Sequence, residues 1–298
     1  MARIVAVVLF SLVIGLGGFH AVEARPLVLG SISSDPTDEM KDWLPFVRHL
    51  AGQLGGEGIS QGTVHVVRDV MGMAGLLKTG QIDLYIDSPI VMISILNESG
   101  AKLLARRWKG GLPDYAAVIF VRQDSGITSL SGLKDKVVAF QKESSSTGYL
   151  LPRALMTLAG LTLQPMAAGT DKPMAGQVGY RFSGADRNTV AWVFHGRVAA
   201  GATSSEDFDK INEAQRAQLT AIIETERIPR HVVAHRGDLP PELVARIKAV
   251  LLAMDQTPEG KKVLDSFELT KKFDDISLAE IESLARYASA LRRAQLIE

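Results

Sequence analysis

The 298-residue sequence contains no cysteine and carries no net charge, because 33 basic residues balance 33 acidic ones. Without cysteine there is no disulfide framework, and no thiol is present to anchor a lipid after an N-terminal leader. A nucleic-acid partner usually leaves an excess of basic residues, so we expect none. The histidines and carboxylates form no clustered ligand motif, so we expect neither a metal site nor a cofactor.

An acid–base pair or a nucleophile elbow is also missing from the sequence. The serines at 144–146 lie in no Gly-x-Ser-x-Gly turn, and no order of residues suggests a catalytic triad. Hydroxyl groups without a base beside them bind more readily than they react. We therefore expect a binding protein rather than an enzyme.

The N-terminus has the three parts of a secretory signal peptide. Arg3 supplies the positive region, residues 4–16 the apolar region, and Val22-Glu23-Ala24 a small-residue cleavage site. This apolar region is shorter than the roughly 20 residues that a membrane-spanning helix needs. We expect residues 1–24 to be removed by cleavage near Ala24, which leaves a soluble periplasmic protein.

Strands and helices alternate along the first half of the chain. Short apolar runs at 26–32, 64–67 and 82–86 are typical of strands, and residues 37–54 and 70–77 have helical periodicity. This alternation favours βαβ units on a mainly parallel sheet, with helices on its faces. The mature chain is also long enough to divide into two lobes.

The second half suggests where the chain crosses between lobes. The run at 115–121 is the most strand-like in the sequence, and strands near 221–228 and 232–235 lead back. We therefore assign residues 25–116 and 226–298 to the first lobe and residues 117–225 to the second. Further strands are expected at 137–140, 176–182 and 197–202, and helices at 185–196, 241–254, 258–267 and 278–296.

A hydroxyl-rich turn joins the strand at 137–140 to a helix expected at 149–158. Its residues Ser145, Ser146, Thr147 and Gly148 lie where the unpaired N–H groups of a helix start attract an anion. A glycine there lets a ligand approach the backbone. The same residues also serve as ordinary helix caps, and this alternative stays open.

The order of these parts resembles the periplasmic phosphonate, phosphite and phosphate binding proteins of ABC transporters. The resemblance covers about residues 27–267, and it implies an α/β protein of the type II periplasmic fold, with two sheet-and-helix lobes and a ligand cleft between them. It also implies that Ser145, Ser146 and Thr147 hold the ligand oxygens. Two segments carry it most specifically: 115–121 with Asp124-Ser125-Gly126-Ile127, Leu130, Leu133 and Lys134, and 145–150 with Pro152.

The chain departs from these relatives at two acidic positions. Asp87, followed by Ser88, stands where some relatives have tyrosine, and Asp186 stands where others have histidine. A carboxylate beside an oxyanion is repulsive unless one of them is protonated or the ligand carries a cation. Asp87 can therefore accept a P–OH hydrogen bond or hold an ammonium group, or it can simply cap a helix. Ser33, with Ser31 and Ser34, completes the candidate site from the first lobe.

These features lead to an expected function with one alternative. The resemblance implies a protein that captures a small tetrahedral oxyanion for an ABC importer, with an inner-membrane permease as partner. The alternative is a sensory protein that reports an oxyanion, including an arsenic or sulfonate type, to a membrane sensor kinase. We expect a monomer.

Overall fold

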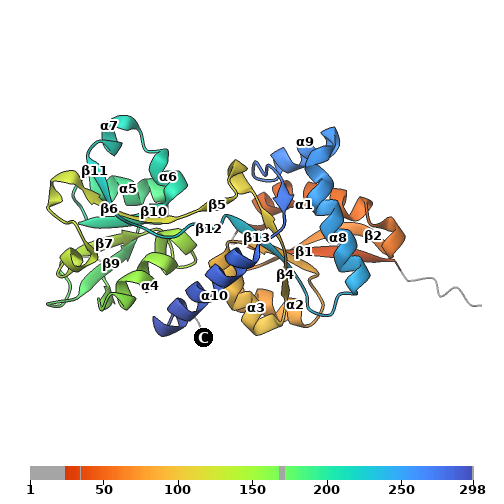
Figure 1. Cartoon of the computed structure of the whole chain (residues 1–298), viewed down its shortest axis with the longest axis horizontal. Helices are drawn as coiled ribbons and strands as arrows, with labels where there is room; N and C mark the ends of the chain where they lie inside the picture. Colours follow the sequence, from red (N-terminus) through yellow and green to blue (C-terminus); the bar gives the residue numbers. More distant parts are fainter. Residues whose placement is uncertain (1–23, 34, 168–171, 297–298) are drawn as a thin grey trace, which may run out of the picture.

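Two six-stranded sheets, each covered by helices on both faces, form two lobes that lie side by side in the computed structural model (Figure 1). The structure describes residues 24–296 except residues 34 and 168–171. The expected signal peptide thus falls almost wholly outside the described residues. Within them, no helix has the length and apolarity that crossing a membrane requires.

The first sheet has the strand order β14-β4-β13-β3-β1-β2. Strand β1 pairs in parallel with β2 and β3, whereas β13 is antiparallel to β3 and β4. The parallel pairing of β1, β2 and β3 follows from the predicted βαβ units, because the helix between two strands carries the chain back to the end of the sheet where the first strand began. The strands are β1 (Arg25–Ile32), β2 (Ile59–Val67), β3 (Leu84–Asp87), β4 (Lys102–Arg107), β13 (His231–His235) and β14 (Phe273–Asp274).

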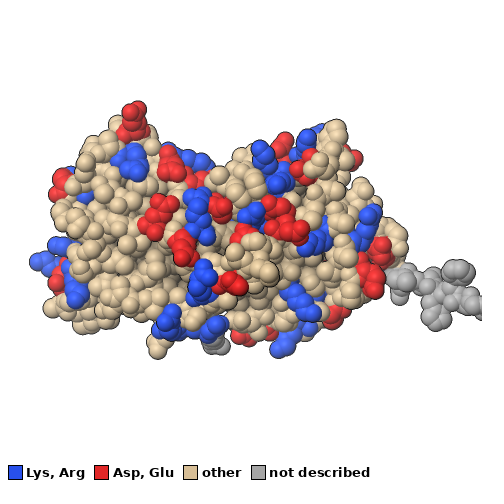
Figure 2. Space-filling model, viewed as in Figure 1, with Lys and Arg blue, Asp and Glu red and all other residues tan. Residues whose placement is uncertain are grey.

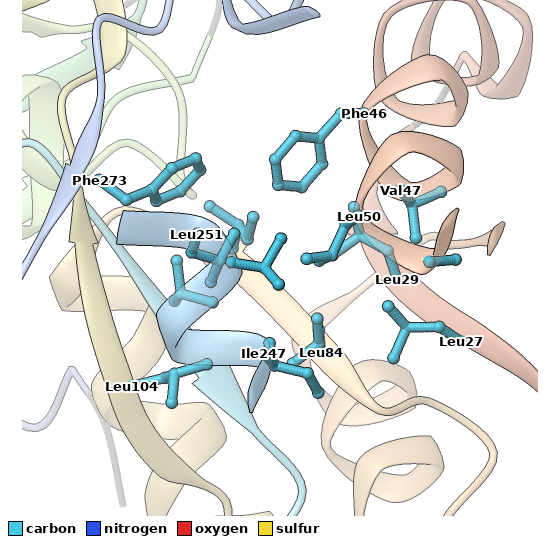
Figure 3. Close-up of a cluster of buried hydrophobic side chains, with 14 of the residues drawn as sticks. Leu27, Leu29, Phe46, Val47, Leu50, Leu84, Leu104, Ile247, Leu251 and Phe273 are labelled. Atoms are coloured by element: carbon cyan, nitrogen blue, oxygen red, sulfur yellow. The ribbon is translucent and has the colours of Figure 1, made fainter. Parts of the chain in front are cut away.

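Helices cover both faces of this sheet. One face packs against α1 (Pro36–Gly52), α8 (Pro241–Ala253) and α9 (Pro258–Ser266), and the other against α2 (Val70–Lys78) and α3 (Pro89–Ser99). Figure 3 shows the first of these layers, where side chains from α1 and α8 meet those of the strands.

Close packing in this core depends on one glycine. A Cβ at Gly62 would lie 2.2 Å from the carbonyl oxygen of Val47, so only glycine lets β2 approach α1 this closely. On the same helix, Phe46 stacks on Phe267 with ring centroids 4.2 Å apart.

The second sheet has the strand order β11-β6-β10-β7-β9-β8. Residues alternate between its faces with the period of two expected of a strand. Val118 and Phe120 of β6 pack toward α5 (Asp186–Phe194), whereas Ile119 and Val121 pack toward the side of α4 (Leu151–Leu158). The strands are β6 (Ala117–Arg122), β7 (Val137–Phe140), β8 (Leu163–Pro165), β9 (Val178–Phe182), β10 (Ala200–Ser204) and β11 (Leu219–Glu224), with the short helices α6 (Ser205–Asp209) and α7 (Glu213–Arg216).

Two crossing segments join the lobes and pair with each other. Strand β5 (Asp114–Tyr115) is antiparallel to β12 (Ile228–Pro229). The single strand expected at 115–121 is therefore divided at Ala116, whose N–H and C=O bond to Ser205 instead of to a neighbouring strand. The strand expected at 221–228 is divided in the same way, because β11 ends at Glu224.

The last helix, α10 (Leu278–Arg293), contacts both lobes. It was expected to complete the first lobe, but it packs on α3 of the first lobe and on α4 of the second (Figure 1). Leu291 is fully buried in this contact, among Ile90, Leu151 and Ile228. The helix therefore lies across the junction between the lobes.

Candidate functional site

The carboxyl ends of five strands face one cavity between the lobes. Open α/β sheets bind their ligands at such ends, where the connecting loops diverge. The cavity has a volume of about 320 Å³. At or just after the ends of β1, β3, β7, β9 and β10, it is lined by Ser31, Asp87, Gln141, Asp186 and Ser204.

The hydroxyl-rich turn folds into one π-helical turn (Ser146–Leu150) that leads into α4. Proline at 152 has no N–H to donate to the carbonyl of Gly148, and that carbonyl accepts from the N–H of Gln141 instead, at 3.0 Å. Ser145 is the N-cap, and its hydroxyl accepts from the N–H of Gly148 at 3.0 Å. Ser145, Ser146 and Thr147 all line the cavity.

Gly148 has a packing role that the sequence did not indicate. It is not among the residues that line the cavity. A Cβ at this position would lie 2.7 Å from both the Cβ of Gln141 and the hydroxyl of Ser145. The glycine therefore lets the turn fold back on the end of β7, independently of any ligand.

Two helix starts, one from each lobe, face each other across the cavity. The hydroxyl of Ser146 donates to the hydroxyl of Ser88 at 2.8 Å, and both residues are buried. Ser88 is the N-cap of α3, and Pro89 follows it. The structure thus brings two of the predicted site residues into direct contact, although they lie far apart in the sequence.

Asp87 lines the cavity, but both of its carboxylate oxygens already accept hydrogen bonds from its own lobe. One accepts from the N–H of Ser88 at 2.5 Å and the other from the hydroxyl of Tyr85 at 2.5 Å. The N-cap of α3 is Ser88, so the alternative that Asp87 caps this helix is wrong.

Asp186 lies on the opposite wall, in the second lobe. It accepts from the hydroxyl of Thr203 at 2.7 Å and from the side-chain amide of Gln141. Burial raises the pKa of this carboxyl above its usual value. A second carboxylate, Asp207, also lines the cavity and accepts from the hydroxyl of Ser204 at 2.5 Å.

Ser33 does not reach the cavity wall. Its hydroxyl accepts from the N–H of Asp35 at 3.0 Å, at the entry to α1. Its neighbour Ser31, 2% exposed, lines the cavity in its place. The third serine considered, Ser34, lies outside the described residues.

Sequence reasoning missed a group of cations on the first-lobe side. The Arg230 guanidinium lies 4.5 Å from the ring centroid of Tyr115, and its Nε donates to Glu206 of the second lobe at 3.2 Å. The Lys109 ammonium is 2.7 Å from a carboxylate oxygen of Glu268. Burial raises the pKa of Tyr115 to about 12, so its hydroxyl stays a neutral donor.

Behind Lys109 lies a second, fully buried guanidinium. Arg107 donates to Glu268 at 3.0 Å and packs 3.7 Å from the ring centroid of Phe267. Burial lowers its pKa to about 10, still above neutral pH, so the guanidinium keeps its charge. The neighbouring His231 is neutral, because burial and then repulsion by Lys109 and Arg107 hold its pKa well below 6.5.

The charges at the junction are therefore mixed rather than of one sign. Figure 2 shows acidic and basic side chains interspersed where the two lobes meet. Within the cavity, Lys109, Lys142 and Arg230 stand against Asp87, Asp186 and Asp207. Such an arrangement can bind an anion and still stabilise a proton or a cation beside it.

A sequence comparison decides the family. The family described as the periplasmic substrate-binding protein of phosphonate ABC transporters matches residues 29–280. The chain belongs to this family. Its members are periplasmic and bind substrates without transforming them, so the predicted family and the absence of an enzymatic function are both confirmed.

Solved structures with the same architecture confirm the type II periplasmic fold. XAC2383 from Xanthomonas citri, solved with ATP and also with chloride, is 27% identical with a TM-score of 0.82 in its ATP-bound form, where the match covers 91% of this chain and 98% of that one. PhnD1 from Prochlorococcus marinus, in complex with methylphosphonate, is 20% identical with a TM-score of 0.64, over 90% of this chain and 99% of that one. The aliphatic sulphonate binding protein SsuA from Escherichia coli is 19% identical with a TM-score of 0.55, over 92% and 94%.

Proposed function

We propose that this chain captures a small tetrahedral oxyanion of the phosphonate, phosphite or phosphate type and delivers it to the permease of an ABC importer. One observation carries the proposal: two hydroxyl-bearing helix starts from different lobes meet at 2.8 Å, with both serines buried, at the wall of the cavity. The N-terminus of a helix carries a partial positive charge and unpaired N–H donors, which suit an anion.

The donors in this proposal come from both lobes. Ser145, Ser146 and Thr147 supply the second lobe, and Ser88 and Ser31 supply the first, Ser31 taking the place expected of Ser33. A hydrogen bond to a charged group contributes roughly 1.5–3 kcal/mol, so a few of them offset the costs of association and closure. Because the donors lie on two lobes, the ligand stabilises the form in which the lobes meet.

The cations and carboxylates have separate roles. Lys109 and Arg230 counter the ligand charge from the first lobe. Asp87 and Asp186, together with Asp207, would repel a fully ionised ligand, so we propose that they face a P–OH proton or an ammonium substituent. The raised pKa of Asp186 supports a site that also tolerates a shared proton.

The species bound in similar structures support a negatively charged ligand. One neighbour was solved with ATP and with chloride, and another with methylphosphonate. We further propose that the protein works with a permease rather than with a sensor kinase, because its family serves ABC transporters. We also propose that it is a monomer.

The test is ligand binding to the mature chain by titration calorimetry, with phosphate, phosphite and methylphosphonate. Replacing Ser145 and Thr147 together by Ala should weaken the binding of the preferred ligand by roughly tenfold or more, about the net contribution of one or two hydrogen bonds. Since Ser145→Ala also removes a helix cap, Thr147→Val alone serves as a variant that removes one hydroxyl at nearly constant volume.

The matched control is Ser129→Ala with Ser131→Ala, an exposed hydroxyl pair of the same lobe outside the cavity. This control should bind like the unmodified chain. An unchanged dissociation constant in both site variants would remove the turn from the ligand site.

A further inference from the structure

A second, larger cavity adjoins the oxyanion cavity. Its volume is about 910 Å³, against about 320 Å³ for the first. The two share part of their walls, so the second is a continuation of the first rather than a separate site. The residues common to both are Ile32, Val70, Val91, Lys142 and Ser144.

Both lobes build the walls of this second cavity. Met71, Ile90 and Ser94 come from α2 and α3 of the first lobe, and Tyr149 and Leu150 come from the π-helical turn that precedes α4 in the second. Leu296, just after α10, also lines it. The cavity therefore changes with the relative position of the lobes, as a ligand-binding space must if closure is coupled to binding.

Apolar, polar and charged side chains together line this cavity, and the apolar ones can cover an uncharged substituent. Ile90 is fully buried, whereas Met71 is 63% exposed, so its side chain is open to contact by a group that enters the cavity. Methionine adapts to ligands of different shape and packs well against aromatic rings. Tyr149, which is 2% exposed, also lines the cavity, and the Arg153 guanidinium donates to its hydroxyl.

The volume of the second cavity also favours an organic ligand. A cavity of 300–1,000 Å³ is typical of sites for organic ligands. A bare tetrahedral oxyanion needs only the donors of the smaller cavity, and it leaves the larger one without a function. The larger cavity begins beside the proposed oxygen donors, so a substituent on the phosphorus can enter it directly.

We propose that the second cavity binds the organic substituent of the ligand, and that the substrates are phosphonates or phosphate monoesters with an apolar, ring-sized group. This proposal rests on the proposed function, because the oxyanion end must occupy the first cavity.

The experiment is a calorimetric series in which only the substituent changes: methylphosphonate, phenylphosphonate and benzylphosphonate, with phosphate as the reference. Burying a ring should make the aryl ligands bind roughly tenfold to a hundredfold more tightly than methylphosphonate. Equal or weaker binding of the aryl ligands, with methylphosphonate still bound, would overturn this proposal and leave the proposed function intact. If no member of the series binds, the proposed function itself fails.

A pair of variants locates the effect. Ser94→Trp fills the second cavity without touching the first, so it should abolish the gain for phenylphosphonate and leave methylphosphonate binding unchanged. Leu158→Trp, at a 43% exposed position of α4 outside both cavities, is the matched control and should keep the gain.

A second variant covers the case in which Ser94→Trp misfolds. Met71→Asp places a carboxylate at an exposed part of the same wall, and it should also weaken aryl ligands selectively. If both variants fold correctly and still bind phenylphosphonate more tightly than methylphosphonate, the substituent lies elsewhere.

Discussion

Among single residues, His231 links the electrostatics of the site to the stability of the fold. It is the first residue of β13, it lines the cavity, and it is buried beside Lys109 and Arg107. A cationic imidazole here would add to the positive charge of the wall, but burial and those neighbours keep it neutral. The positive charge on this wall therefore comes from Lys109 and Arg230, not from the histidine.

This neutrality predicts a pH dependence of folding. Because the pKa of His231 is well below 6.5 in the folded state, the unfolded chain takes up its proton first as the pH falls through that value. The stability that the neutral histidine contributes is thus present above about pH 6.5 and lost below it. Between pH 7.5 and 5.5 we expect a loss of about 1 kcal/mol from this residue.

Urea denaturation at pH 7.5 and 5.5 measures the effect. His231→Gln should lose about 1 kcal/mol less than the unmodified chain over this interval, whatever its absolute stability. His195→Gln, at an exposed position, is the control and should follow the unmodified chain. Identical losses in all three proteins would contradict a neutral His231.

At the level of elements, the order of strands and helices could be predicted because each has its own hydrophobic period. The strand–turn–helix setting of Ser145 could be predicted for the same reason, together with local capping chemistry. The breaks at Ala116 and after Glu224 could not, because they arise from bonds and pairings made across the junction of the lobes.

The cations of the site lay beyond sequence reasoning for a related reason. Lys109 follows β4 and Arg230 follows β12, and they meet only because β13 pairs beside β4 in the folded sheet. No local motif joins them. For Ser33 the sequence predicted a ligand donor that the cavity does not use. The serine-rich segment after β1 suggested a set of donors, but the Ser33 hydroxyl accepts a hydrogen bond from the N–H of Asp35 at the entry to α1.

The helix that contacts both lobes, α10, gives the next prediction. Leu291 is fully buried between α10 and the helices of both lobes, so truncation to Ala should leave a cavity there and cost about 2–4 kcal/mol of unfolding free energy. Ile281→Ala, on the same helix but 39% exposed, should cost much less. Chemical denaturation followed by circular dichroism measures both, and equal costs would show that α10 does not pack as described.

For the whole molecule, side-chain contacts join the two lobes on either side of the cavity. Besides the bond between Ser88 and Ser146, Arg230 of the first lobe donates to Glu206 of the second at 3.2 Å, with side chains 18% and 12% exposed. A partly buried pair of this kind resists screening by salt better than an exposed one. Glu206 therefore holds the lobes together and competes with any anion for the Arg230 guanidinium.

Glu206→Gln should shift the ligand-free protein toward an open form. Losing about 1 kcal/mol from the pair changes the ratio of closed to open molecules roughly fivefold, because every 1.4 kcal/mol is a factor of ten. Small-angle X-ray scattering should then give a larger radius of gyration for the ligand-free variant than for the unmodified chain. Saturating ligand should bring both proteins to the same value, because the bound oxyanion joins the lobes in place of the carboxylate.

The control for this effect is Asp124→Asn, which removes an ion pair with Arg122 that lies within the second lobe. It should leave the radius of gyration unchanged, since neither partner touches the first lobe. If Glu206→Gln gives the same ligand-free radius as this control, the ion pair does not determine how far the lobes close. The bond between Ser88 and Ser146 and the packing of α10 would then be sufficient to hold them together.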